Sequence, residues 1–302
     1  YGLVGSEMCI RDRSWMDIAA NPIRFGTDGW RGMIAADFTI ERVVRVAPVA
    51  ALALAQSASA PSGSRSIIVG YDRRFMAEDF ARAAAEAIAQ AGYEVKLSSC
   101  FAPTPVFSWI AYDQKALGAI VLTASHNPGR YLGLKVKGSF GGSVSGDVTH
   151  QIETLLAQGS QGLEPSGSGP GTLSEFDPWA TGYLETLRQF VDVAAIRSAI
   201  AAGELAVFVD AMHGASAGGL ARLLEVPVTE FNSDRDPLFA GGAPEPLPKY
   251  TARSITAVRD YGQAHPDQRI GAFVFDGDCD RIAAIDRSGD FLTSQILIPV
   301  LI

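Results

Sequence analysis

Cysteine is scarce in this 302-residue chain, and the three cysteines present have no paired spacing. They are Cys9, Cys100 and Cys279, an odd and widely separated set that supports neither a disulfide framework nor a cysteine-based zinc site. Basic residues are also in the minority, since 25 Lys and Arg stand against 33 Asp and Glu and the net charge is −8. Such a chain is repelled by nucleic acids and anionic membranes unless a local patch overrides the total. We therefore expect neither as a partner.

A hydrophobic run long enough to cross a bilayer is missing as well. The best candidate, Val46–Ala55, contains Pro48 and is well short of the roughly 18 apolar residues that a span needs. Residues 1–14 contain no apolar core of a signal peptide. These absences predict a soluble, cytoplasmic protein of a reducing compartment.

Apolar residues are, by contrast, plentiful. Hydrophobic residues make up 47% of the chain and charged residues 19%, and the mean hydropathy is +0.13. Such a chain can bury a substantial core, which excludes disorder of the chain as a whole, and its length suits two domains. The 31 glycines and 16 prolines indicate many tight turns and close backbone approaches.

Short apolar runs alternate with segments of helical periodicity along most of the chain. The predicted strands are 66–70, 93–98, 117–124, 205–210, 272–275 and 282–285. The predicted helices are 77–91, 104–112, 148–157, 179–202, 217–224 and 253–263. This order is typical of an α/β protein built from βαβ units, in which ligands bind at the carboxyl ends of the strands. Functional residues are therefore expected in the turns that follow strands.

Composition also predicts the domain boundaries. Gly, Ser and Pro dominate residues 159–174, which we predict to be a linker between a first domain at 16–158 and a second at 175–290. Residues 1–15 have no periodicity and are interpreted as a non-native leader. Residues 291–302 include an apolar segment that is expected to open a buried helix of a third, truncated domain.

Three carboxylates are spaced two residues apart directly after the predicted strand at 272–275. They are Asp276, Asp278 and Asp280, in the segment FDGDCDR. In a folded-over loop these side chains converge, and without a cation three like charges in one turn repel one another strongly. Oxygen ligands favour Mg²⁺, followed by Ca²⁺ or Mn²⁺, and the loop lacks the glutamate of an EF-hand. An exposed acidic turn is the alternative.

A serine and a histidine lie side by side in the turn at the end of the predicted strand at 117–124. The segment LTASHNP contains Ser125, His126 and Asn127, and a serine at a strand end suggests a nucleophilic hydroxyl with polar neighbours. Taken alone, the pair is explained more simply by a turn in which Ser125 and Asn127 bond the local backbone. The nucleophile elbow G-x-S-x-G is absent, which argues against a hydrolase triad.

Basic side chains lie in or beside other turns of the sequence. They are Arg31 in FGTDGWRG, Arg73 and Arg74 in GYDRR, and Lys135 in LGLKVK. The planar fork of arginine donates two parallel hydrogen bonds, which suits phosphate recognition. Each residue taken singly is explained as well by an ordinary surface position. Together with the serine turn and the acidic loop, however, they predict metal-assisted phosphoryl transfer.

The order of these motifs resembles the α-D-phosphohexomutase superfamily and, within it, the phosphoglucomutase/phosphomannomutase enzymes. The likeness rests on FGTDGWRG, GYDRR, TASHNP, GLK, VDAMHG, GAPEP and DGDCDR, and it extends from about residue 23 to the end. It implies an α/β fold of two consecutive phosphohexomutase domains with mixed sheets sandwiched by helices, followed by the start of a third domain. The sugar-recognising loop of the third domain and the phosphate-clamping loop of the fourth have no counterpart, so this fragment is expected to be nearly inactive alone.

The resemblance also implies a reaction, the interconversion of hexose 1-phosphates and hexose 6-phosphates, with glucose and mannose as the expected sugars. Ser125 is the implied phosphoserine, which gives its phosphoryl group to the sugar phosphate. A bisphosphorylated sugar then forms as an intermediate, and a sugar bisphosphate serves as the primer. One Mg²⁺ would be held by Asp276, Asp278, Asp280 and a phosphate oxygen on Ser125.

Further site residues are assigned by the same resemblance. Lys135 and His126 would transfer protons and stabilise charge at the sugar hydroxyl, with Lys135 ranked first. Arg31 and Arg281 match arginines close to the phosphoserine. The residues expected to bind substrate phosphate are Arg31, Arg73, Asn127 and Lys135.

The sequence departs from the pattern of the family at two positions. Leu132 stands where many relatives have an asparagine before Gly-x-Lys, which weakens the hydrogen bonding expected around Lys135. Cys279 occupies a small-residue position of the acidic loop, and a thiol there is open to oxidation.

Two other functions remain as alternatives. A phosphatase of the haloacid-dehalogenase type would use Asp276 as its nucleophile, but only 22 residues follow Asp280, too few for the rest of its motifs. A non-catalytic module that binds phosphosugars or a metal is the second alternative. Phosphorylation of Ser125 would distinguish the mutase from both.

Overall fold

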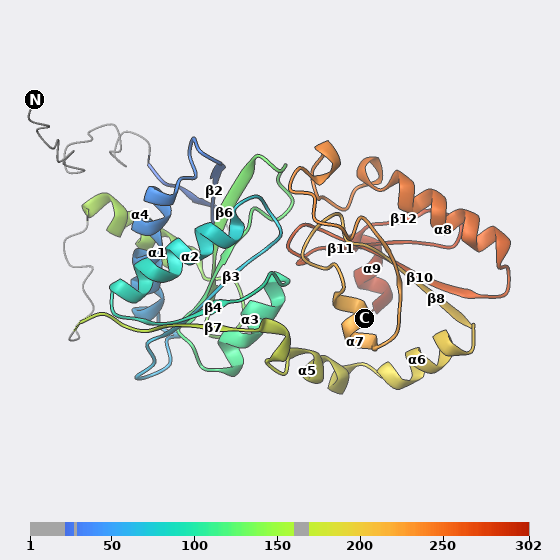
Figure 1. The fold of residues 1–302 in the computed structure, drawn as a ribbon, viewed down its shortest axis with the longest axis horizontal. Coiled ribbons are helices and arrows are strands. Elements are labelled where there is room, and N and C mark those ends of the chain that lie inside the picture. The colour runs from blue at the N-terminus through green and yellow to red at the C-terminus, as the bar shows by residue number, and fades with distance from the viewer. Residues whose placement is uncertain (1–21, 27–28, 160–168, 302) are drawn as a thin grey trace, which may run out of the picture.

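The computed structural model describes residues 22–26, 29–159 and 169–301, which form two α/β units side by side (Figure 1). The first unit contains a seven-stranded sheet of order β1-β2-β6-β5-β3-β4-β7, and the second contains a five-stranded sheet of order β12-β11-β10-β8-β9. The expected α/β class with two consecutive mixed sheets is confirmed. The predicted leader at 1–15 lies outside the described residues.

The first unit carries parallel and antiparallel strands in one sheet. Its elements are β1 (Phe25–Gly26), β2 (Gly29–Met33), α1 (Ile40–Ala55), β3 (Ser66–Tyr71), α2 (Ala77–Gln90), β4 (Glu94–Ser98), α3 (Thr104–Asp113), β5 (Gly118–Leu122), β6 (Tyr131–Gly138), α4 (Gly146–Gln158) and β7 (Leu173–Phe176). β3 is parallel to β4 and β5, whereas β6 is antiparallel to β5 and β2. The turn between β5 and β6 therefore lies at the carboxyl end of the parallel strands.

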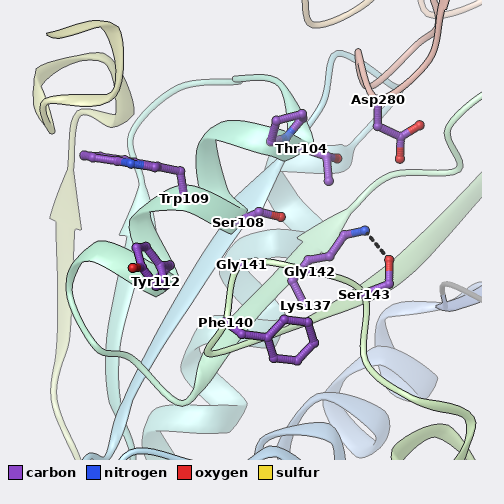
Figure 2. A pocket seen from close by; sticks show the side chains of 11 residues that line it. Thr104, Ser108, Trp109, Tyr112, Lys137, Phe140, Gly141, Gly142, Ser143 and Asp280 are labelled. Atoms are coloured by element: carbon purple, nitrogen blue, oxygen red, sulfur yellow. Dashed lines mark hydrogen bonds between the residues drawn. The ribbon is translucent and has the colours of Figure 1, made fainter. Parts of the chain in front are cut away.

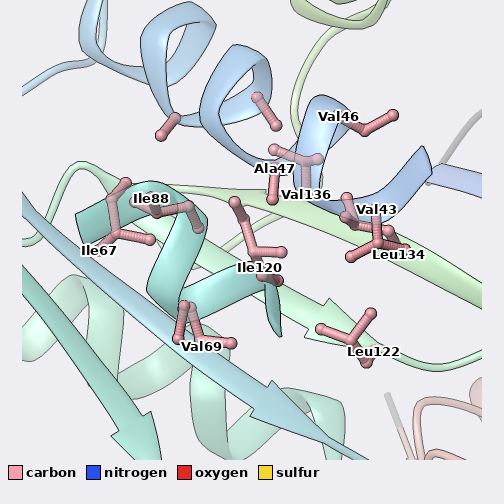
Figure 3. Close-up of a cluster of buried hydrophobic side chains, with 14 of the residues drawn as sticks. Val43, Val46, Ala47, Ile67, Val69, Ile88, Ile120, Leu122, Leu134 and Val136 are labelled. Carbon is pink, nitrogen blue, oxygen red and sulfur yellow. The ribbon is translucent and has the colours of Figure 1, made fainter. Parts of the chain in front are cut away.

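The central strands are apolar on both faces because helices cover both. Ile120 and Leu122 of β5 pack with Val69 of β3 beneath α1 and α2 (Figure 3), whereas Ala119 and Val121 point to the opposite face, against α3. Successive side chains of a strand alternate between faces. A continuous apolar run such as GAIVL is the sequence of a strand buried on both sides.

Helix α1 covers one face of the sheet despite Pro48 in its interior. A proline inside a helix removes one backbone hydrogen bond. The helix begins after Thr39, whose side chain accepts a hydrogen bond from the backbone N–H of Arg42, and buries an apolar face that includes Val43 and Leu54. From the sequence, part of this segment was recognised only as an apolar run. The burial of α1 in the core offsets the lost hydrogen bond.

The second unit is built in the same manner around β10. Its elements are η3 (Pro178–Ala180), α5 (Tyr183–Phe190), α6 (Val193–Ala201), β8 (Leu205–Asp210), α7 (Gly219–Leu224), β9 (Thr229–Phe231), η4 (Phe239–Gly241), η5 (Pro248–Tyr250), α8 (Ala252–Ala264), β10 (Arg269–Phe275), β11 (Ile282–Ile285), β12 (Phe291–Leu292) and α9 (Ser294–Leu301). β10 is parallel to β8 and antiparallel to β11. The loop between β10 and β11 thus again lies at the carboxyl end of parallel strands.

Strand pairing passes two of the predicted domain boundaries, which stay predictions. Part of the predicted linker at 159–174 lies outside the described residues, but its end belongs to β7, which pairs in parallel with β4 of the first sheet. β7 is an edge strand with exposed side chains, so it has no apolar signal. The second sheet likewise extends beyond residue 290, because β12 pairs with β11.

The single helix predicted at 179–202 is wrong. The segment is divided into η3, α5 and α6. Gly182 precedes α5 in a left-handed conformation, and the side chain of Asp192 caps α6 by accepting a hydrogen bond from the N–H of Ala195. Capping residues start new helices, and here they interrupt an otherwise continuous periodicity.

The helix expected near the end of the chain is present as α9, and apolar side chains along it are exposed. Ile296, Ile298 and Val300 are 48%, 55% and 75% exposed, respectively. Among the described helices, none combines the length and apolarity that crossing a membrane requires.

The core makes a testable prediction at Ile120, which is fully buried. We expect Ile120→Ala to lower the free energy of unfolding by about 2–5 kcal/mol, because it leaves a cavity, and Ile120→Val to lower it by only about 0.5–1.5 kcal/mol. Urea unfolding followed by circular dichroism measures both. Equal losses for the two variants would contradict the tight packing described here.

Candidate active site

Two loops from different units meet at the centre of the molecule. The serine loop (residues 123–130) follows β5, and the aspartate loop (residues 276–281) follows β10. The hydroxyl of Ser125 donates a hydrogen bond of 2.8 Å to Oδ2 of Asp276. The hydroxyl and the acidic cluster, although distant in sequence, therefore share one site at the carboxyl ends of two parallel strand sets.

The serine loop holds its nucleophile candidate in a strained conformation. Ser125 is 1% exposed and has a φ of 53°, in the left-handed region, which non-glycine residues adopt at an energetic cost. Its N–H donates to Oγ1 of Thr123 at 2.9 Å, and that hydroxyl donates to Oδ2 of Asp72 at 2.6 Å. The surrounding hydrogen bonds thus fix the backbone of Ser125.

Arg74 is the main support of the serine loop. Its guanidinium is fully buried and paired with Asp72, and it donates to a series of backbone carbonyls along the loop. These acceptors are the carbonyls of Ser125 at 2.6 Å, Asn127 at 2.7 Å, Pro128 at 3.2 Å and Tyr131 at 3.1 Å. Buried carbonyls need partners, so one side chain satisfies most of this turn.

The aspartate loop folds around its own first carboxylate. Oδ1 of Asp276 accepts hydrogen bonds from the N–H groups of Asp280 and Arg281, both at 3.0 Å. At Gly277 an added Cβ would lie 2.4 Å from the carbonyl oxygen of Ser125, so only glycine permits the two loops to approach this closely. The ligand oxygens of Asp276, Asp278 and Asp280 all lie within 4.8 Å of one another.

Asp278 is held by the first unit. Its Oδ2 accepts hydrogen bonds from the hydroxyl of Thr104 at 2.6 Å and from Nζ of Lys135 at 2.7 Å. Its other oxygen, Oδ1, is buried and has no hydrogen-bond partner among the described residues. A buried carboxylate oxygen without a donor is costly, and a bound cation would satisfy it.

The donor set therefore fits a hard divalent cation. Three carboxylates converge, one buried oxygen lacks a partner, and the hydroxyl oxygen of Ser125 adjoins them. Carboxylate and hydroxyl oxygens are the ligands that Mg²⁺ prefers.

Crowding of negative charge perturbs the acidic groups. Burial, together with the charges of Asp278 and Asp280, raises the pKa of Asp276 to about 8. Burial alone would also raise the pKa of Asp278, but the ammonium of Lys135 and the hydrogen bonds from Lys135 and Thr104 lower it below its usual value. The two pKa values shift in opposite directions, so without a metal a proton is favoured on Asp276 over Asp278.

Lys135 projects from β6 into the acidic cluster. Its ammonium is 2% exposed and donates to Asp278 at 2.7 Å and to Asp280 at 2.5 Å. The structure thus brings Lys135, a predicted site residue, to the acidic cluster. Leu132, the departure noted on the same strand, packs instead into the apolar core on the opposite face of the sheet.

His126 and Arg31 also lie at the serine loop. Nδ1 of His126 is 3.4 Å from the hydroxyl of Ser125. Burial, followed by the charges of Arg281 and Arg31, lowers the pKa of His126, which favours its neutral form. Arg31 of β2 donates to Oδ1 of Asn127 at 2.9 Å.

Arg73 contacts the second unit instead. Its guanidinium donates to the carbonyl oxygen of Ser233 at 2.7 Å and to that of Gly214 at 3.4 Å, and it stacks 4.8 Å from the ring of Phe101. Its predicted role in binding phosphate has no support from these contacts and stays a prediction.

The supporting roles of Arg74, Thr104 and Thr123 were not predicted from the sequence. Arg74 was noted only as a phosphate ligand candidate, whereas its donors are used by backbone carbonyls. Thr104 lies between two prolines at the start of α3, a pattern that signals a helix start but not a contact with Asp278.

A cavity of about 450 Å³ adjoins the acidic cluster on the side of α3 (Figure 2). Asp280 and Thr104 lie at one end, and Trp109 and Phe140 contribute aromatic surface. Nζ of Lys137 donates to the hydroxyl of Ser143 in its wall. A pocket with aromatic walls and a few polar groups suits a small polar ligand.

Comparisons with known proteins agree with the arrangement of the two units. The family model described as phosphoglucomutase/phosphomannomutase, alpha/beta/alpha domain I, matches residues 22–162, and the model for domain II matches residues 181–289. A phosphoglucosamine mutase of Levilactobacillus brevis is 28% identical over 88% of this chain, and one of Limosilactobacillus reuteri is 30% identical over 89%.

Solved structures show the same likeness. A candidate phosphomannomutase of Thermus thermophilus superposes with a TM-score of 0.73 and 34% identity over 89% of this chain. The chain spans 56% of the length of each of the two curated relatives and 58% of the Thermus chain.

The network around Arg74 predicts a large loss of stability on a conservative substitution. We expect Arg74→Lys to lower the free energy of unfolding by about 3 kcal/mol or more, because one ammonium cannot serve the carbonyls that the guanidinium reaches and several stay buried without donors. Urea unfolding measures the loss, and Arg82→Ala, which removes an exposed ion pair with Glu175, is the control. Similar losses for both variants would contradict the role of Arg74.

The raised pKa of Asp276 predicts that Mg²⁺ binding depends on pH. Because the cation needs a carboxylate, it must displace the proton held up to a pKa of about 8. We expect the affinity to rise by up to about tenfold per pH unit below this pKa and to level off above it. Isothermal titration calorimetry in buffers of different ionisation enthalpy detects the released proton.

The same shift affects the stability of the metal-free protein. The folded pKa exceeds the unfolded value of 3.8, so the free energy of unfolding should fall as pH rises from about 4 to about 8. An affinity for Mg²⁺ that does not change between pH 4 and pH 8 would show that Asp276 is already ionised in the folded protein.

Proposed function

Because this chain belongs to the phosphoglucomutase/phosphomannomutase family, we propose that it carries the phosphoserine and Mg²⁺ site of a phosphohexomutase. In this proposal it interconverts hexose 1-phosphates and hexose 6-phosphates as part of a protein with the further family domains. The observation that carries the proposal is the contact of 2.8 Å between the hydroxyl of Ser125 and the carboxylate of Asp276, because it joins the phosphoryl carrier and the cation ligands in one site.

In the proposed reaction, Ser125 first gives up a phosphoryl group and later regains one. The P–O bond to Oγ of Ser125 breaks while a P–O bond to a hydroxyl of the hexose phosphate forms, and the product is a bisphosphorylated sugar. The proton lost by the sugar hydroxyl is matched by the one that Ser125 regains. In the second half, the other phosphoryl group of the sugar returns to Ser125, so that a sugar bisphosphate can also prime the unphosphorylated enzyme.

Asp276, Asp278 and Asp280, with an oxygen on Ser125, would hold the Mg²⁺. A bound Mg²⁺ supplies neutralisation of the charge that develops on the transferring phosphoryl oxygens. Arg74 and Thr123 keep Ser125 in place during transfer, because both bond its backbone.

In this proposal, His126 accepts a proton and Lys135 stabilises negative charge. The lowered pKa of His126 keeps its imidazole neutral beside Ser125, so it can accept the proton of the sugar hydroxyl. Lys135 is bound as an ammonium by two carboxylates, which suits stabilisation of charge more than acceptance of a proton. Arg31 and Asn127, bonded to each other at the serine loop, and Arg281 would bind phosphate oxygens.

The sugar is a hexose phosphate. Glucose and mannose phosphates are expected from the resemblance in sequence, and the relatives named phosphoglucosamine mutase add glucosamine phosphate to the candidates. The cavity beside Asp280 offers aromatic and hydroxyl groups on which a sugar ring could rest. A panel of the three sugar phosphates, tested with the complete protein, separates them.

Phosphorylation of Ser125 tests the proposal. We expect the 302-residue chain, incubated with glucose 1,6-bisphosphate and Mg²⁺, to gain one phosphoryl group, and Ser125→Ala to gain none, because the carrier hydroxyl is lost. Intact-mass spectrometry reads the result, and peptide mapping locates the group. Ser57→Ala removes a hydroxyl that bonds the carbonyl of Leu54 in α1 and the hydroxyl of Ser59, and this variant should behave as the parent chain does.

Two outcomes would contradict the mutase. Phosphorylation of Ser125→Ala at Asp276 would instead support a phosphatase that uses an aspartate nucleophile, and absence of any phosphorylation in the parent chain would support a binding module.

A further inference from the structure

Outside the acidic cluster, each unit contributes an arginine side chain that binds the backbone of the other unit. The guanidinium of Arg73, in the first unit, donates to the carbonyl of Ser233 in the second unit at 2.7 Å. Two residues further on, Arg235 returns the contact by donating to the carbonyls of Arg73 at 3.3 Å and Arg74 at 3.1 Å. We name this pair of reciprocal contacts, together with Glu78, the arginine clasp.

Arg235 uses both Nε and Nη2 as donors in the clasp. Besides the two carbonyls, its Nη2 donates to both carboxylate oxygens of Glu78, at 3.0 Å and 2.8 Å. Glu78 lies in the first turn of α2, so the side chain of Arg235 ties a loop of the second unit to both the backbone and a helix of the first. Only an arginine has donors spaced for such a set of acceptors.

The clasp is joined to the serine loop through Arg74. Arg235 binds the backbone carbonyl of Arg74, and the side chain of Arg74 binds the carbonyls of Ser125 and Asn127. The ring of Phe239, from the same segment as Arg235, lies 4.8 Å from the guanidinium of Arg74. A shift of the second unit at Arg235 therefore acts on the residue that supports Ser125.

A second series of contacts joins the clasp to the aspartate loop. Arg73 donates to the carbonyl of Gly214, and the next residue, Ala215, donates its N–H to the carbonyl of Gly277 at 2.9 Å. Gly277 itself lies against the carbonyl of Ser125. Both loops of the site are thus joined to the clasp through intermediate residues, the serine loop through Arg74 and the aspartate loop through Gly214 and Ala215.

We propose that Arg235 is a positioning residue for the cation site, holding the aspartate loop in register with the serine loop across the boundary of the two units. The inference rests on the proposed function, in that the site takes Mg²⁺. Arg235 touches neither loop directly, and its side chain is 43% exposed. Its effect is therefore exerted through Arg73 and Arg74.

The affinity for Mg²⁺ tests the proposal without relying on catalysis. We expect Arg235→Ala to weaken Mg²⁺ binding to the 302-residue chain by about tenfold, as for residues coupled through a contact network. Glu78→Gln removes the negative charge of one partner but leaves an acceptor oxygen and the two carbonyl contacts, so a smaller loss is expected. Isothermal titration calorimetry well below the unfolding temperature measures both. Small-angle scattering measures whether the radius of gyration rises when the contacts of Arg235 are lost.

Arg82→Ala is the matched control. Arg82 lies on α2, one turn from Glu78, and forms an exposed ion pair of 2.6 Å with Glu175 of β7, so both partners belong to the first unit. It should leave the affinity for Mg²⁺ and the radius of gyration unchanged. An Arg235→Ala variant that matches Arg82→Ala in both measurements would overturn the proposal.

The two hypotheses fail in different ways. A parent chain that does not bind Mg²⁺ would refute the cation site of the proposed function. A parent chain that binds Mg²⁺ and an Arg235→Ala variant that binds it equally well would refute only the role of Arg235.

Discussion

Three carboxylates brought together in a buried place are the constraint on which the rest of this structure depends. Asp276 and Asp278 are fully buried, and such charges are tolerated only with cations and hydrogen-bond donors around them. The side-chain donors come from the other unit: the hydroxyls of Ser125 and Thr104 and the ammonium of Lys135. The acidic loop therefore needs the first unit as much as the serine needs the second.

The serine loop, by contrast, needs hydrogen-bond donors for its own buried carbonyls. Its turn exposes several backbone carbonyls to the interior, and Ser125 takes up a left-handed conformation. A buried guanidinium, that of Arg74, meets this requirement because it carries many donors and a charge that Asp72 balances. The positive support under the serine and the negative cluster above it meet at the hydroxyl of Ser125, where a phosphoryl group and a cation would both be stabilised.

Much of the fold could be predicted because its signals are local. Ile120 and its neighbours form an unbroken apolar run, so the strand β5 was predicted, whereas no element was predicted at α1 or β6. The failures occur where the signal is weak or depends on distant partners. β7 is exposed and polar, β12 is two residues long, and Asp192 caps α6 inside a periodic segment. Arg73 and Arg74 were indistinguishable in sequence, yet one spans the two units and the other supports the serine loop.

The sequence by itself determined the chemical groups of this protein: a serine beside a histidine and three aspartates with alternate spacing, each placed at the end of an apolar run, and a lysine shortly after the serine turn. Motif order was enough to indicate the family. Only the tertiary structure decided which of these groups meet, because Ser125 and Asp276 come together through the packing of two separate sheets. It also decided the protonation of the site, since the pKa of Asp276 reflects burial and neighbouring charges that a linear chain does not contain.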